Sequence, residues 1–428
     1  MQKIKVIFRS NLFKIASLNS FSIVLKIAIG FITSKFIALF VGPAGMALVG
    51  NFRNFLSSTQ AVVTLGFETG IVKYVAENKL DTEYLKKIIA TITIFLIALC
   101  AVFSLLIYFY SDFLNHIIFG NPFKFSFVFK VVALALPFYL CSLLLVSVIN
   151  GLGCFKKVII INCIGYLIGL FVSLFLIYFL KTEGALLSII ITPSLLFFVN
   201  LFYIQSEIAI FEYVKLDFFD ASILKKFSSY SIMVFVSSII GPIILLVIRN
   251  NFIEKAGLNS AGFWEAISRI SSYYMLFITT ILSLYFLPKL SESKTIQSTN
   301  HIFYNYFKTI LPLFGFGLLL VYLLRFYVIS ILFTKEFLPT EKLFFWQLLG
   351  DFFRAASYIL AFQFYAKKKT TAFVISELLS LTVLYFSSIY FVNSFGFEGI
   401  VMAHCATYII YFTGLLFYFR ATVFDLKK

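Results

Sequence analysis

The sequence predicts an all-α polytopic membrane protein with twelve transmembrane helices. Of its 428 residues, 61% are hydrophobic and only 13% are charged, a composition that excludes an ordinary soluble domain. Apolar stretches of about 20 residues, the length that lets a helix cross the ~30 Å hydrocarbon core, recur from one end of the chain to the other. The segments between them are too short to hold a folded domain.

Twelve such stretches can be placed, and an even number puts both chain ends on the same side of the membrane. The first follows a basic N-terminal tail, but it is too long for a signal peptide and carries lysines, so we expect a retained helix. The expected spans are 15–40, 44–72, 87–110, 126–149, 157–180, 184–205, 227–250, 261–287, 304–325, 341–365, 371–393 and 397–419.

Basic residues are distributed unequally between the two sides. The tails and loops on the side of the termini hold 21 Lys and Arg, whereas the opposite loops hold seven: Lys124, Lys181, Arg249, Lys255, Arg325, Lys335 and Lys342. Loops rich in Lys and Arg stay in the cytoplasm, so both termini are predicted to be cytoplasmic. Topology and contact with anionic lipid then explain the net charge of +16 without a nucleic-acid ligand.

The segment 207–226 lies near the midpoint and separates six spans from six more. Its phenylalanines alternate with charges, so we expect an amphipathic linker along the membrane surface. The predicted domains are an N-terminal six-helix lobe, 1–206, the linker, and a C-terminal six-helix lobe, 227–428, as in two-lobed transporters. A shift of 215 residues aligns 41–79 with 256–294, although only five of 39 residues are identical.

Cysteine and histidine indicate neither a metal site nor a catalytic centre. The five cysteines include no CxxC, and the three histidines, His116, His301 and His404, are scattered along the chain. We therefore expect no cofactor, no metal ligand and no catalytic residue. A GxxxxGK[ST] loop is also absent from the sequence, so ATP is not expected to drive the protein directly.

A polar stripe follows one face of each of the first two spans. In the second span, residues three or four apart form the series Arg53, Ser57, Gln60, Thr64 and Glu68. In the first span the series is Asn19, Ser22, Lys26, Gly30 and Thr33. A charge at mid-bilayer costs roughly 2.5–3.5 kcal/mol on insertion scales, so these groups are expected to face protein or water.

The alternative for these cations is that they extend to the membrane interface while the hydroxyl groups join neighbouring helices. That interpretation suits Lys35 and Lys73, which lie near span ends, better than Lys26 and Arg53. The N-terminal half keeps an excess of mid-span cations, whereas acids nearly balance bases in the C-terminal half. A cationic cavity of this kind predicts an anionic ligand.

The eighth and tenth spans each carry a pair of opposite charges. Glu265 and Arg269 are at i, i+4, and Asp351 and Arg354 are at i, i+3, so each pair could neutralise itself within its helix. A second interpretation stays open, in which the Arg lies beside a water-filled cavity and its guanidinium group binds phosphate oxygens through two N–H groups.

Three motifs within residues 40–79 carry a resemblance to a known family: Gly42-Pro43-Ala44-Gly45, Asn51-Phe52-Arg53 and Val72-Lys73-Tyr74-Val75. Weaker matches follow at 262–264, 287–291 and 350–354. The region resembles the first two helices of the Wzx-type flippases for lipid-linked oligosaccharides, with the nearest likeness to the enterobacterial translocases for O-antigen and the common-antigen lipid.

The resemblance implies two six-helix lobes around a central cavity that opens alternately to the cytoplasm and the periplasm. It implies that an undecaprenyl-pyrophosphate-linked oligosaccharide, such as an O-antigen repeat unit of lipopolysaccharide, moves to the outer leaflet of the bacterial inner membrane. Pyrophosphate contacts are then expected from Lys26, Arg53, Arg269 and Arg354, and sugar contacts from Asn19, Ser57 and Gln60.

Glu68 and Asp351 are the candidates for coupling to H+ or Na+, since antiport is what the resemblance implies. The expected partners are the lipid-linked oligosaccharide and membrane lipids, with an O-antigen polymerase and a chain-length regulator as candidate protein partners.

Other classes of protein stay open at this point. A drug or cation exporter of the same superfamily should carry acidic residues at the centre of its first helix, where this chain has Lys26. A lipid II flippase commonly has helices beyond twelve. A membrane enzyme such as a polymerase should have a large periplasmic loop or an intramembrane His with acidic partners.

Overall fold

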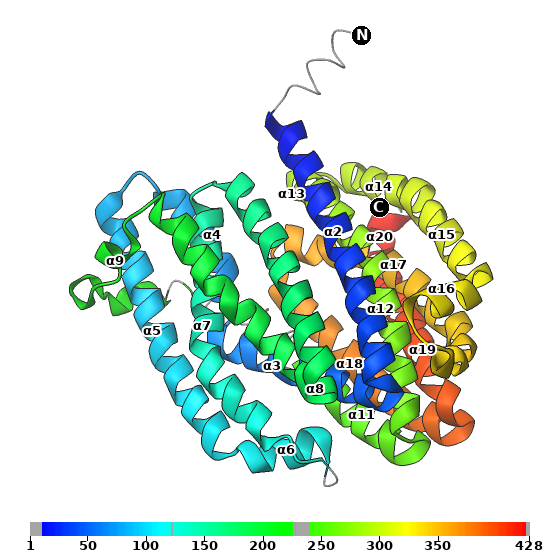
Figure 1. Cartoon of the computed structure of the whole chain (residues 1–428). Helices are drawn as coiled ribbons and strands as arrows, with labels where there is room; N and C mark the ends of the chain where they lie inside the picture. Colours follow the sequence, from blue (N-terminus) through cyan, green and yellow to red (C-terminus); the bar gives the residue numbers. More distant parts are fainter. Residues whose placement is uncertain (1–10, 121–122, 226, 228–239, 425–428) are drawn as a thin grey trace. The chain divides into compact units, whose positions relative to one another are not determined.

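The computed structural model describes residues 11–120, 123–225, 227 and 240–424, and all regular secondary structure in these residues is helical (Figure 1). The chain forms two compact units. The first comprises Met1–Val41 with Asn51–Pro242, and the second comprises Gly42–Gly50 with Ile243–Lys428. The predicted lobes 1–206 and 227–428 stay predictions.

The elements up to the midpoint are mostly long apolar helices. They are α2 (Asn11–Phe40), α3 (Gly42–Thr64), α4 (Phe67–Asn78), α5 (Thr82–Phe109), α6 (Ser111–Phe119), α7 (Ser126–Gly151), α8 (Phe155–Gln205), α9 (Ile210–Tyr213) and the short 3-10 turn η1 (Leu216–Phe218). The predicted linker 207–226 packs against α5, where the Asp220 backbone N–H donates to Thr91 Oγ1 at 2.9 Å. Ile210 and Ile223 of this segment are buried, while Phe211 and Leu216 are exposed.

The elements of the second half follow from Gly241 onward. They are α11 (Gly241–Ala256), α12 (Leu258–Ile281), η3 (Leu282–Phe286), α13 (Leu287–Glu292), α14 (Ile296–Asn305), η4 (Tyr306–Ile310), α15 (Leu311–Leu323), α16 (Arg325–Leu332), η5 (Lys335–Leu343), α17 (Phe344–Ala366), α18 (Thr370–Phe395), η6 (Gly396–Glu398), α19 (Gly399–Tyr418) and α20 (Arg420–Val423). The π-helical turns η3 and η4 each end just before a proline, Pro288 and Pro312, which lacks the N–H that would continue the α-helical bonding.

The predicted helices are confirmed in number and kind wherever the structure describes them. Seven helical stretches of the described residues are long and apolar enough to cross a membrane, and two of them, Phe155–Gln205 and Thr370–Tyr418, each hold two predicted spans. The span predicted at 44–72 is divided between α3 and α4, and the span at 341–365 corresponds to α17. The span at 227–250 lies partly outside the described residues.

Each of the two long stretches reverses direction at a strained backbone position. Lys181 has φ 49° within α8, and a Cβ on Gly184 would lie 1.9 Å from the Leu176 carbonyl oxygen. Gly396 has φ 59° between α18 and α19, and a Cβ on Gly399 would lie 2.1 Å from the Phe391 carbonyl oxygen. Glycine is required at both close approaches, because any side chain would collide with the preceding helix.

The residues with positive φ reveal a structural repeat. Residues with positive φ occur in pairs separated by 215 residues: 42 and 257, 153 and 368, and 181 and 396. This is the offset at which residues 41–79 align with 256–294 in the sequence. The turns that begin α3 and α12, and those that reverse the chain later, therefore recur at equivalent places in the two halves.

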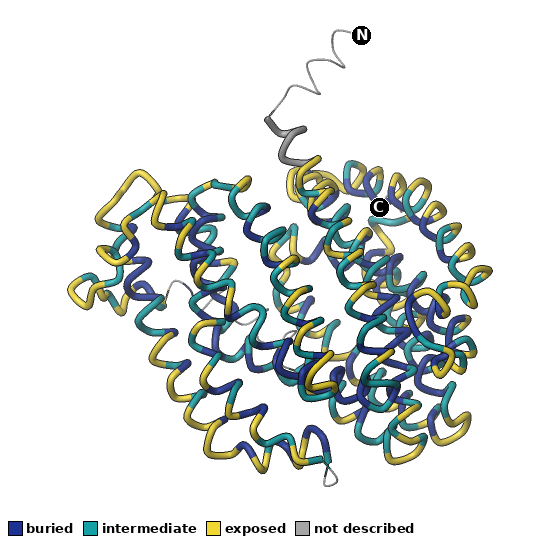
Figure 2. The backbone as a smooth tube through the Cα atoms, in the orientation of Figure 1, coloured by how far each residue is buried: buried dark blue, intermediate teal, exposed yellow. Residues whose placement is uncertain are grey.

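Exposed residues recur along many of the helices (Figure 2), and many of them have large apolar side chains. The most exposed include Phe109, Phe171, Phe202, Ile331 and Phe386, with 64–75% of their surface accessible. A soluble monomer rarely exposes so many large apolar side chains, whereas such side chains are stable against lipid tails. The exposure pattern therefore fits a protein embedded in hydrocarbon.

The close approach of α12 to the start of α3 gives a testable prediction. A Cβ on Gly262 would lie 1.9 Å from the Pro43 carbonyl oxygen, whereas one on Gly317 of α15 would meet nothing within 4 Å. Gly262→Ala should destabilise the protein by about 1–3 kcal/mol through overpacking. Gly317→Ala should be neutral or stabilising, because Ala favours the helix. The thermal unfolding midpoints in detergent compare the two variants, and equal midpoints would contradict the packing described.

Candidate functional site

The second predicted span is broken in its C-terminal part. Leu65 and Gly66 have φ values of 50° and 67°, so α3 ends at Thr64 and α4 begins at Phe67. The Gly66 N–H donates to Thr64 Oγ1 at 3.3 Å. This bond gives a partner to one of the backbone groups that lose their helical hydrogen bonds at the break. Irregular backbone at membrane depth is tolerated only where it is buried in protein or lines a cavity.

A polar cavity lies at this break. Its volume is about 370 Å³, and its lining residues are Ser57, Gln60, Ala61, Thr64, Gly66, Glu68, Thr69 and Pro242. The structure thus brings together three of the predicted site residues, Ser57, Gln60 and Glu68. Discontinuous helices form the binding sites of many transporters in this way.

Hydrogen bonds hold the cavity's polar groups in a chain. Gln60 Nε2 donates to Glu68 Oε1 at 3.2 Å, and Gln60 Oε1 accepts from the Tyr139 hydroxyl at 2.5 Å. Glu68 belongs to the first turn of α4, where the helix dipole favours a negative charge. Tyr139 was not predicted, because a single Tyr within the apolar helix α7 belongs to no polar stripe.

The predicted cations of the N-terminal half lie elsewhere. Lys26 is exposed on α2, with its Nζ 6.0 Å from the centre of the Tyr166 ring. Arg53 is half-buried on α3, one turn before Ser57, and Asn19 is half-buried near the start of α2. The described lining of the cavity holds the Glu68 carboxylate but neither Lys nor Arg. The cavity at the break is therefore acidic, whereas the sequence favoured a cationic one.

A second polar cluster surrounds Asp351 on α17, whose side chain is fully buried. Asp351 Oδ2 accepts hydrogen bonds from the Ser271 hydroxyl at 2.7 Å, the Tyr274 hydroxyl at 2.5 Å and Gln347 Nε2 at 3.0 Å. Asp351 Oδ1 lies 3.1 Å from His404 Nε2 and 3.8 Å from Arg354 Nη1. This number of donors satisfies an ionised carboxylate away from water.

Arg354 forms the predicted i, i+3 pair with Asp351 but keeps 30% of its side chain exposed. Its Nε donates to the Tyr358 hydroxyl at 2.7 Å, and its guanidinium lies 5.4 Å from the centres of the Tyr358 and Tyr408 rings. Two aromatic faces therefore hold the guanidinium in a fixed direction. This arrangement is compatible with both interpretations of the pair, as a structural contact and as a cation presented to a ligand.

A third cluster, formed by Arg249, Glu265 and Arg269, is almost fully buried. Arg249 Nη2 lies 2.9 Å from Glu265 Oε2, and Arg269 Nε lies 3.3 Å from Glu265 Oε1. The Arg249 guanidinium also stacks 4.7 Å from the Trp264 ring centre. Gly50 makes room for it, because a Cβ there would lie 2.1 Å from Arg249 Nη1.

This cluster corrects one prediction and sharpens another. Arg249 was assigned to a loop outside the membrane, but it lies inside α11 with 4% of its surface exposed. The hydropathy pattern placed it at a span end and could not reveal its partner Glu265. Arg269 forms the predicted i, i+4 pair, and its burial means that it can reach a ligand only by leaving that pair.

Comparison with known proteins assigns the chain to a family. Residues 12–294, about two thirds of the chain, match the family described as polysaccharide biosynthesis protein. The chain belongs to this family. It is 26% identical over 394 residues to the lipid III flippase of Escherichia coli K12, a match that covers 92% of this chain and 94% of that protein. The lipid III flippase of Shigella flexneri matches to the same extent.

Solved structures show the same fold for this family member. An inward-facing MATE-family multidrug transporter of the MOP superfamily gives a TM-score of 0.78 at 11% identity, covering 95% of this chain and all of that one. The lipid II flippase MurJ gives 0.71 at 16% identity, covering 95% and 87%. The resemblance stated from residues 40–79 is confirmed, and the family member is a transporter rather than an enzyme.

The buried ion cluster gives a second prediction. Glu265→Gln removes the carboxylate shared by two buried guanidinium groups, and breaking a buried pair in this way costs about 3–5 kcal/mol. Glu341→Gln is the control, since it removes the partner of Arg325 from an ion pair that is 29% and 40% exposed and is worth about 0–1 kcal/mol. The two variants are compared by thermal unfolding in detergent, and a Glu265→Gln midpoint no lower than that of the control would argue against the cluster as a stabilising element.

Proposed function

We propose that this chain is a flippase that moves an undecaprenyl-pyrophosphate-linked oligosaccharide from the cytoplasmic to the periplasmic leaflet of the bacterial inner membrane by alternating access. The cargo is the repeat unit of an O-antigen or a similar surface glycan. The observation that carries the proposal is the match to lipid III flippases along 92% of the chain. The excess of Lys and Arg on the side of the termini supports cytoplasmic ends.

The described residues suit the three chemical parts of such a cargo. The apolar outer surface is compatible with a polyprenyl tail. Hydroxyl and amide groups, among them Ser57, Gln60 and Asn19, offer hydrogen bonds to sugar. For the pyrophosphate we propose Lys26, Arg53 and Arg354, which are exposed or partly exposed, with Arg269 joining them if it leaves Glu265.

The membrane potential supports transport in this direction. An inside-negative potential favours outward movement of an anionic head by about 2.3 kcal/mol per charge and 100 mV. Ion antiport through Glu68 or Asp351 would add to that force. The geometry favours Glu68, because it lines a cavity and the described residues offer it few hydrogen-bond donors, whereas Asp351 is fully enclosed by donors. A polymerase and a chain-length regulator are the protein partners that we propose to use the product.

The role of Arg53 gives a third prediction. Arg53→Ala, in a protein expressed at the normal level, should stop surface-glycan assembly and trap the lipid-linked repeat unit in the inner leaflet, because the head loses a cationic contact. Arg325→Ala is the matched control, since it removes a partly exposed Arg from an ion pair outside the proposed site. Both variants are scored by surface glycan and by the lipid-linked oligosaccharide that accumulates in the cell.

Wild-type glycan in Arg53→Ala cells would remove Arg53 from the site. Loss of the whole gene tests the function itself. If the lipid-linked oligosaccharide does not accumulate but the cells become sensitive to drugs, the protein is an exporter and not a flippase.

The coupling residue gives a fourth prediction. Glu68→Gln keeps the hydrogen bond to Gln60 but cannot exchange a proton or balance a cation, so transport in vesicles should lose its response to an imposed ion gradient. Asp351→Asn should instead lower the thermal unfolding midpoint, because it removes the charge that five neighbouring groups contact. A Glu68→Gln protein with an unchanged response to both H+ and Na+ gradients would exclude Glu68 as the coupling group.

A further inference from the structure

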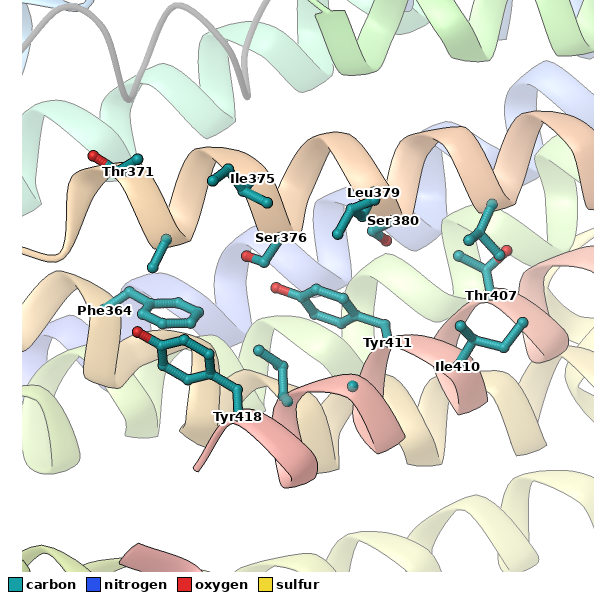
Figure 3. Close-up of a pocket in the computed structure, with 14 residues that line it drawn as sticks. Phe364, Thr371, Ile375, Ser376, Leu379, Ser380, Thr407, Ile410, Tyr411 and Tyr418 are labelled. Carbon is teal, nitrogen blue, oxygen red and sulfur yellow. The ribbon is translucent and has the colours of Figure 1, made fainter. Parts of the chain in front are cut away.

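A groove runs between α18 and α19, with Phe364 of α17 at one end (Figure 3). Its volume is about 520 Å³, and its walls come from residues 371–383 of α18 and 407–418 of α19. At 1.5 Å per helical residue, the α18 wall is about 18 Å long. The groove therefore extends over more than half of the ~30 Å hydrocarbon core.

The lining of the groove is mainly apolar and suits hydrocarbon better than water. Two of the hydroxyl groups in its walls donate within their own helices: Ser376 donates to the Phe373 carbonyl at 2.8 Å and Thr407 to the Ala403 carbonyl at 2.7 Å. The Tyr411 hydroxyl lies beside Ser376 (Figure 3). A bound water needs two to four polar partners, whereas most of the lining is the hydrocarbon of Ile, Leu, Val, Ala and Phe side chains and of tyrosine rings. Ile375 and Ile410, each 53% exposed, form the rims, so the groove opens outward toward lipid.

One end of the groove is basic. Lys369 Nζ lies 5.6 Å from the centre of the Tyr418 ring, which lines the groove, and the Arg420 guanidinium lies 4.7 Å from the Phe417 ring. Lys367 and Lys368 are the adjacent residues in the chain. Between Thr370 and Tyr418 the sequence contains neither Lys nor Arg, so the basic residues of this stretch of chain flank the helix pair at this end. An occupant with an anionic head and an apolar tail is complementary to the groove.

The small residues of α18 indicate which kind of lipid tail the groove can hold. Ala372, Ser376 and Ser380 leave notches in the wall at intervals of four residues, about 6 Å along the helix. A prenyl chain carries a methyl branch on every isoprene unit, and recesses of this kind leave the width that such branches need and a straight acyl chain does not. Gly414 of α19 opens the facing wall, since a Cβ there would meet nothing within 4 Å.

We propose that the α18–α19 groove binds the prenyl tail of an anionic polyprenyl lipid, with the phosphate of that lipid against Lys369 and Arg420. The inference rests on the proposed function and adds to it a site for the tail, whose lining includes none of the four basic residues proposed for the pyrophosphate. A site of this kind holds the lipid in the leaflet that faces the basic end, before or after the sugar-bearing head is moved.

The tail is tested with a pair of matched glycine variants. Gly414→Leu fills the groove, whereas Gly317→Leu adds the same side chain to α15, where the space is also open. Undecaprenyl phosphate is titrated against the purified full-length protein by native mass spectrometry. Gly414→Leu should bind about tenfold more weakly, because it displaces about two buried methylene groups of the tail, and Gly317→Leu should bind as wild type.

The proposed position of the phosphate head is tested by removing one basic residue at a time. Each of Lys369→Gln and Arg420→Gln should weaken undecaprenyl phosphate about fivefold, the effect of one basic residue near an anionic lipid head. Neutral undecaprenol should bind equally to these variants and to wild type. A loss of undecaprenol binding as large as that of the phosphate would overturn the proposed position of the head.

Two results would overturn the groove itself. Equal binding of undecaprenyl phosphate to Gly414→Leu and Gly317→Leu would show that the tail binds elsewhere. Weaker phosphatidylglycerol binding by Gly414→Leu, with undecaprenyl phosphate unchanged, would show that the groove holds a membrane phospholipid.

These outcomes are separable from those of the flippase proposal. If undecaprenyl phosphate binds in the groove but deletion of the gene causes no lipid-linked oligosaccharide to accumulate, the groove stands and the transport proposal fails. If the oligosaccharide accumulates but Gly414→Leu binds undecaprenyl phosphate as wild type does, the transport proposal stands and the groove fails.

Discussion

The structure depends on one constraint, that charge and irregular backbone inside a bilayer must be satisfied by the protein itself. Glu265 does so by accepting from two guanidinium groups, and Asp351 by collecting hydroxyl, amide and imidazole partners. The open backbone at Leu65–Gly66 is satisfied in part by Thr64. Glu68 differs from the other two acids, because its carboxylate lines a cavity and its partners in the described part of the chain are few.

Hydropathy predicts the helices well because each span needs about 20 apolar residues, and a run of that length can be recognised in a single sequence without an alignment. It could not predict the break in the second span, since two residues with positive φ hardly change an average over such a length. The pairs Glu265–Arg269 and Asp351–Arg354 were predictable because partners three or four residues apart share a helical face.

Contacts distant in the sequence could not be predicted in the same way. His404 meets Asp351 from 53 residues away, and Arg249 meets Glu265 from another helix. Neither His404 nor Arg249 belongs to a series of polar residues spaced three or four apart, so the sequence did not indicate that either contacts an acid. An intramembrane His beside an acid had been expected only of an enzyme, and here the pair belongs to a transporter fold whose carboxylate is enclosed by further donors.

The repeated positive-φ positions bear on how this chain arose. At 42 and 257 both residues are glycine, whereas glycine at 153 and 396 is matched by lysine at 368 and 181. Backbone shape has thus been kept where side-chain identity has been lost. This is the trace that duplication of an ancestral half-length gene would leave, and the two halves now differ in their polar groups: Glu68 and the broken helix belong to the first, the enclosed Asp351 and the groove between α18 and α19 to the second.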